Sequence, residues 1–186
     1  MWRLLDEMCS FEQLQYFNIP DIDLYMDQVT TFIDEKLSYL KRNEEEVTLT
    51  KTMINNYTKS GILMPPKKKK YSRQHMVLII FTYHLKQILS INDIQSIFSP
   101  LVNGIKLGED YGGNLEDVYK KFLDIEKKEI EDFKSNFGNM FTEEEKPSDC
   151  SNENINELII TVLSLVIKSA IQKRMAEKII DEFFEK

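Results

Sequence analysis

The sequence predicts an all-helical protein, and three observations support this class. Glycine and proline are scarce, with six and five among 186 residues. Apolar residues recur at spacings of three and four, which places them on one face of a helix. Some of these runs are also bracketed by helix-starting and helix-stopping residues, such as Thr50 and Gly61.

The first long helix is expected from about Asp21 to Lys41. Pro20 and Asp21 follow a short amphipathic opening and offer a helix start. One apolar face then repeats through Ile22, Met26, Val29, Ile33, Leu37 and Leu40. An acidic, solvated connection follows at residues 44–46.

A shorter helix is predicted from Lys51 to Ser60. Thr50 is a good N-cap, and Gly61 ends the helix at a position where the backbone turns left-handed. At 100° per residue, Met53, Ile54 and Tyr57 point inward. The solvent-facing side then consists of Lys51, Thr52, Asn55 and Lys59, with Asn56 at its margin.

Pro65 and Pro66 force an extended passage into four consecutive lysines, Lys67 to Lys70. Ser72 caps a helix from Arg73 to about Leu89 that is apolar on nearly all sides, as expected of a central core helix. Ser90 and Asp93 form a capping box for a short helix that should end near Phe98. Residues 101–113 are expected to be irregular.

The remaining chain predicts two long helices joined by a flexible linker at residues 138–154. The first runs from Leu115 to Asn136, with an apolar side made of Leu115, Val118, Phe122, Ile125 and Phe133. The second runs from Ile155 to Phe184. Its most apolar tract, Leu158–Ile171, falls short of the roughly 20 residues that a membrane span requires, so a buried helix and no membrane partner are expected.

Charge is distributed unevenly along the chain. The stretch from Val47 to Asn92, called the basic strip below, has eight Lys or Arg residues and no Asp or Glu. At the chain's average composition it would hold roughly eight acidic residues. The strip carries +8 and the rest of the chain −15, and such a segment in an acidic protein is typical of nucleic-acid binding.

The sequence offers no catalytic, cofactor or metal site. Cys9 and Cys150 lack metal-ligand or disulfide-framework spacing, and His75 and His84 lie half a turn out of phase on one helix. Carboxylate pairs occur without a nucleophile motif or a phosphate-binding loop beside them, so we expect no enzyme. The N-terminus has no signal-peptide pattern, and a cytoplasmic location is expected.

The order of signals from Thr50 to Phe98 resembles the winged-helix DNA-binding domain of MerR-type regulators. The matching residues are Met53–Tyr57, Gly61–Leu63, Pro65–Pro66, Lys67–Ser72 and Ser90–Ile94. Residues 21–101 are most similar to a bacterial family known as domain of unknown function 1836, itself regarded as MerR-like. The wing is shorter than a full hairpin, and the acidic connection replaces a tight turn.

The resemblance implies a transcriptional regulator that binds duplex DNA as a homodimer, with no cofactor. It implies an N-terminal extension at residues 1–20, a DNA-binding domain at 21–101, and a C-terminal region at 102–186 that dimerises or binds an unknown effector. The expected DNA contacts are Lys51, Thr52, Asn55, Asn56, Lys59, Lys67, Lys68, Lys69, Lys70, Tyr71 and Arg73. The alternative is a non-enzymatic helical protein-interaction module whose basic strip docks on an acidic partner.

Overall fold

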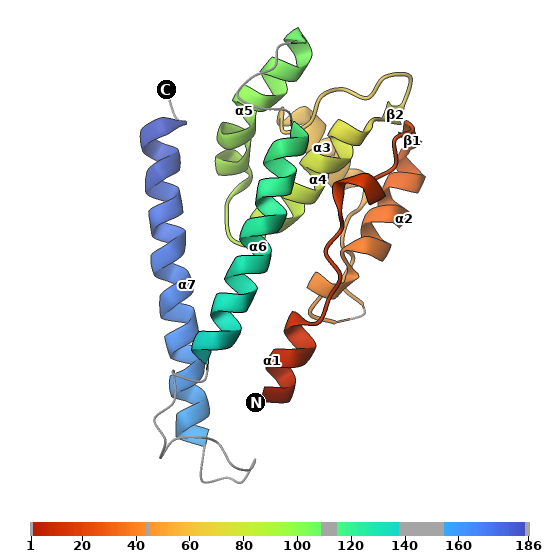
Figure 1. Ribbon diagram of the computed structural model, residues 1–186. Coiled ribbons are helices and arrows are strands. Elements are labelled where there is room, and N and C mark those ends of the chain that lie inside the picture. Colours follow the sequence, from red (N-terminus) through yellow and green to blue (C-terminus); the bar gives the residue numbers. More distant parts are fainter. Residues whose placement is uncertain (1, 44, 109–114, 138–154, 185–186) are drawn as a thin grey trace.

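The computed structural model describes residues 2–43, 45–108, 115–137 and 155–184, and it confirms the all-helical class (Figure 1). The helices of this part of the chain surround a two-stranded antiparallel sheet. The elements are α1 (Trp2–Cys9), η1 (Tyr16–Asn18), β1 (Leu24–Tyr25), α2 (Met26–Lys36), η2 (Ser38–Leu40), α3 (Lys51–Lys59), β2 (Lys70–Tyr71), α4 (Arg73–Leu85), α5 (Ile91–Leu107), α6 (Leu115–Phe137) and α7 (Ile155–Phe183).

Helix α2 begins at Met26, five residues after the start expected at Asp21. The preceding residues are extended because β1 pairs with β2, with Leu24 opposite Tyr71 and Tyr25 opposite Lys70. The Tyr25 backbone N–H donates to the Gln28 side chain at 2.9 Å, which closes the first turn. The strand pairing thus takes residues that the helical periodicity alone had assigned to α2.

Helix α3 has the predicted boundaries and the predicted orientation. The Met53 backbone N–H donates to Thr50 Oγ1 at 3.1 Å, and Gly61 adopts a φ of 81°. Ile54 and Tyr57 are buried, while Met53 is half-buried. The helix therefore rests on the core through one face and leaves the opposite face to solvent.

Helix α4 is the centre of the fold. Its residues from His75 to Tyr83 are all buried, as the encircling apolar pattern predicts, although the helix ends at Leu85 instead of Leu89. The ring of Phe81 lies 6.2 Å from that of Phe98 and 5.2 Å from that of Phe122. Aromatic side chains of α5 and α6 thus meet on one side of α4.

Helix α5 starts at the predicted capping box but does not end near Phe98. The Ser90 N–H donates to Asp93 Oδ2 at 2.9 Å, and the helix continues through Pro100 to Leu107 before Gly108 turns left-handed. Proline removes one backbone hydrogen bond, but Phe98 and Val102 on either side of it are buried on the same face. Packing therefore holds the helix together across the proline, and residues 101–107 are not irregular.

Helix α6 packs through a different side from the one predicted. Leu115, Tyr119 and Leu123 are buried, whereas Ile125 is 60% exposed. The Tyr119 hydroxyl donates to the Leu14 carbonyl at 2.7 Å, so α6 also holds the N-terminal segment. The predicted linker at 138–154 lies outside the described residues.

Helix α7 runs along one side of the molecule and packs against α5 (Figure 1). Ile180 is its buried residue, so the expectation of a buried helix is wrong for the single chain. Small or polar residues such as Ser164 and Ala176 are half-buried. The large aliphatic residues from Leu158 to Ile171 are 41–66% exposed. By length and composition α7 could cross a membrane, a property that core helices of soluble proteins share.

Candidate nucleic-acid interface

The outward face of α3 presents five of the candidate DNA contacts. Lys51, Thr52, Asn55, Asn56 and Lys59 are all exposed. The N-cap and the left-handed Gly61 fix both ends of the helix. This face therefore combines two lysines with three polar side chains that can donate and accept hydrogen bonds.

The lysine run forms a tight two-residue turn. The Lys67 N–H donates to the Lys70 carbonyl at 3.1 Å, and the Lys70 N–H donates to the Lys67 carbonyl at 2.9 Å. Lys68 and Lys69 have φ values of 50° and 64°, as a type I′ hairpin turn requires. Lys67, Lys68 and Lys69 are exposed, and no acidic side chain in the described part of the chain forms a salt bridge with them.

Strand β2 then sends successive side chains in opposite directions. The Lys70 ammonium lies 5.0 Å from the centre of the Tyr25 ring, on the outer surface of the sheet. Tyr71 is 2% exposed and packs edge-on against His75, with 5.5 Å between ring centres. Tyr71 therefore does not lie on the surface with the lysines, because neighbouring residues of a strand face opposite sides.

Arg73 is half-buried at the start of α4. Its Nη2 lies 3.4 Å from Asp21 Oδ1, and its guanidinium lies 5.1 Å from the centre of the Tyr16 ring. Its side chain is thus already engaged within the chain, unlike Lys67, Lys68 and Lys69.

Two acidic residues that precede the basic strip approach it in the fold. Asp27 of α2 forms an ion pair with Lys51, and Asp21 reaches Arg73. Both carboxylates are largely exposed, and exposed ion pairs contribute only about 0–1 kcal/mol. The +8 of the linear strip is therefore reduced locally, and the uncompensated charge lies in the lysine turn.

A family model described as Domain of unknown function (DUF1836) matches residues 14–122. The chain belongs to this family. The hydrophobic core extends from Leu14 to Leu123, nearly the same range as the match. No curated protein and no solved structure matches the chain.

Within the DUF1836 segment, His75 links the lysine turn to α4. Its Nδ1 accepts from the Ser72 N–H at 3.1 Å, which leaves Nε2–H to donate to the Met64 carbonyl at 3.2 Å. Burial lowers the pKa of His75, so the neutral ring that this pattern requires is favoured. Sequence reasoning identified this histidine as structural, but the spacing alone did not show that it positions the segment before the turn.

Among the described residues of the DUF1836 protein, no group of three or more His, Cys, Asp or Glu side chains is arranged to hold a metal ion. Cys9 is a free, half-buried thiol. Cys150 lies outside the described residues.

Proposed function

We propose that this chain is a MerR-like transcriptional regulator that binds duplex DNA. The observation that carries the proposal is the pairing of two exposed features, the polar outer face of α3 and the lysine turn. Both lie on the basic strip, and the turn has positive charge that no acidic side chain of the described residues neutralises through a salt bridge.

In the proposed complex, α3 enters the major groove and the turn lies along the phosphate backbone. The amide of Asn55 or Asn56 can accept from N6 and donate to N7 of adenine, which provides sequence choice. Lys59, together with the exposed lysines of the turn, supplies affinity that does not depend on sequence. Tyr71 has no part in this interface because its ring is buried.

The helix pair α2–α3 differs from a standard helix-turn-helix in its connection. A usual turn has three or four residues, whereas residues 37–50 and the short helix η2 separate α2 from α3 here. The two helices nevertheless contact one another, and Thr48 is fixed by a 2.8 Å hydrogen bond to Asp34 of α2. In this proposal the turn between residues 67 and 70 serves as a minimal wing.

We further propose that the protein acts as a cytoplasmic homodimer joined through α7. Ile155, Ile159, Leu163, Ile167 and Ile171 form one row at four-residue spacing and are 50–61% exposed. Such rows pack into the grooves of another helix, so a second copy of α7 would cover them.

The test is selection of bound fragments from random duplex DNA by the full chain. An enriched inverted repeat would support both DNA binding and two-fold symmetry. Recovery of no preferred sequence, together with affinity for acidic proteins that salt abolishes, would instead favour the protein-interaction module.

A further inference from the structure

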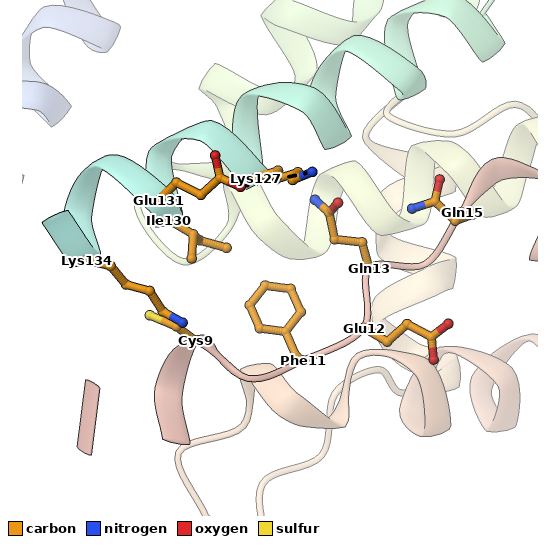
Figure 2. Close-up of a pocket in the computed structure, with 9 residues that line it drawn as sticks. All are labelled: Cys9, Phe11, Glu12, Gln13, Gln15, Lys127, Ile130, Glu131 and Lys134. Atoms are coloured by element: carbon orange, nitrogen blue, oxygen red, sulfur yellow. Dashed lines mark ion pairs between the residues drawn. The ribbon is translucent and has the colours of Figure 1, made fainter. Parts of the chain in front are cut away.

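A groove lies beneath the second half of α6, away from the proposed DNA-binding elements. Two hollows of about 580 and 450 Å³ form it, and both are lined by Cys9, Phe11 and Ile130. Figure 2 shows Phe11 projecting from the segment after α1 into the space beneath α6, with Ile130 above its ring. In Figure 1, α1 and the end of α6 lie at the bottom of the molecule, while β1 and β2 lie at the upper right.

The walls of the larger hollow are mostly apolar and aromatic. Phe11 stacks on Tyr39 with 4.1 Å between ring centres and an interplanar angle of 8°. Met8, Leu40 and Phe133 complete the apolar lining. A pocket of this size with such a lining is typical of sites that bind small organic molecules.

The carboxylate of Glu126 lines the same hollow and is held in place from one side only. Gln13 Nε2 donates to Glu126 Oε2 at 2.8 Å and also contacts the Leu123 carbonyl at 2.8 Å, which fixes the amide. The other carboxylate oxygen, Oε1, lies 4.0 Å from His84 Nδ1, too far for a hydrogen bond. Glu126 is only 15% exposed, so its charge is poorly hydrated.

The basic groups beside this hollow do not neutralise Glu126. Burial lowers the pKa of His84 to about 4, so its imidazole is uncharged at neutral pH. Lys41 is engaged by Asp34 at 2.7 Å, and Glu129 adds a second carboxylate at the rim. The hollow is therefore an aromatic cavity with a net negative lining.

We propose that this groove binds an amphipathic organic cation, whose ammonium contacts Glu126 and whose apolar body packs between Phe11, Tyr39 and Phe133. A cation in this position would compensate a carboxylate that the fold leaves without a charged partner. Aromatic rings within about 6 Å attract the same cation through their electron-rich faces. The site does not rest on the proposed DNA binding, because none of its residues belongs to the proposed DNA contacts.

Three probes with a common phenylbutyl body test the proposal on the full chain by titration calorimetry. 4-Phenylbutylamine is cationic, 4-phenylbutanol is neutral and 4-phenylbutyrate is anionic. The expected order of affinity is amine, alcohol, carboxylate. Equal affinities, or no binding of the amine at millimolar concentration, would overturn the proposal.

Two variants locate the charge that is responsible. Glu126→Gln keeps the shape and the hydrogen bond from Gln13, and it should weaken amine binding by about tenfold or more while leaving alcohol binding unchanged. Asp124→Asn removes an exposed carboxylate of the same helix and should change neither. Amine affinity unaltered in Glu126→Gln would overturn the assignment.

A pH series on the parent protein gives the same test without a substitution. Burial raises the pKa of Glu126, so amine affinity should rise from pH 5 to pH 7.5 as this carboxyl ionises, while alcohol affinity stays constant. The other titratable groups that face Glu126 are His84, Tyr39 and Tyr119. The pKa of His84 lies near 4 and burial raises the pKa of both tyrosines, so these three groups keep their protonation states across this range. A pH-independent affinity for the amine would overturn the proposal.

Discussion

Replacing the two residues at the tip of the lysine turn separates charge from fold. Lys68 and Lys69 have positive φ values, a conformation that costs a residue with a side chain roughly 1 kcal/mol or more. Asn and Gly are the residues preferred in a type I′ turn. The double variant Lys68→Asn, Lys69→Gly should therefore fold at least as stably as the parent while it loses two positive charges per protomer.

The effect on DNA binding follows from the number of phosphates released. If both lysines contact phosphates, a homodimer loses four contacts, and the slope of log K against log salt should flatten by roughly 0.9 × 4, or about 3.6. At about 0.1 M salt this corresponds to a loss of affinity of roughly a thousandfold, which disappears towards 1 M. Fluorescence anisotropy with a labelled duplex between 50 and 400 mM salt measures the slope.

A matched control removes the same charge elsewhere. Lys121 and Lys128 are exposed residues of α6, and changing both to Gln alters the net charge equally. This control should leave the salt slope within experimental error of the parent. The same slope in the turn variant and the parent would remove the turn from the DNA interface and refute the reasoning.

Three further predictions concern recognition, pH and assembly. Asn55→Ala should cost about 1–3 kcal/mol on the selected operator and almost nothing on random DNA. Ile54→Ala should instead lower the free energy of unfolding by about 2–5 kcal/mol in chemical denaturation, because Ile54 is fully buried. Burial lowers the pKa of His84 from 6.5 to about 4, so its contribution to stability is complete above pH 6.5 and is lost as pH falls toward 4. The parent should lose roughly 2 kcal/mol between pH 6.5 and 5 that His84→Gln does not lose; equal losses would contradict this assignment. Leu163→Lys with Ile167→Lys should convert a homodimer into a monomer in sedimentation experiments, and a parent that is monomeric at micromolar concentration would contradict pairing through α7.

The elements that the sequence predicts well are those defined by short-range signals. Thr50 and Gly61 bound α3 because capping depends on residues within a few positions of the helix end. The start of α2 and the end of α5 depend on distant partners. Leu24 is extended because Tyr71 pairs with it, and Pro100 is accommodated because the face of α5 around it is buried.

The candidate interface divides in the same way. The outward direction of Asn55 follows from the helical period and the buried position of Ile54, so it could be predicted. The burial of Tyr71 depends on its membership of a two-residue strand whose partner lies far back in the chain. The ion pair between Asp27 and Lys51 also joins separate elements, and an acid-free stretch of sequence gives no sign of it.

The groove under α6 could not be predicted at all. Its polar residues come from segments more than 100 positions apart, as the hydrogen bond from Gln13 to Glu126 shows. In the sequence Glu126 is one of many charged residues on an amphipathic helix. Only the loss of solvent around it distinguishes it from its neighbours on that helix.

The burial of α4 on all sides determines how the molecule can be taken apart. Amide hydrogens in the middle of this helix should be the last to exchange with deuterated solvent, because releasing them requires the surrounding helices to separate from it. α4 draws its cover from both sides in the chain, from Leu14 and Ile54 before it and from Phe98 and Tyr119 after it. Shortening the chain to residues 21–101 would strip an aromatic wall from Phe81 and leave α4 partly wetted. The smallest fragment that preserves the surroundings of this helix is residues 14–123, and its slow-exchanging amides should match those of the full protein.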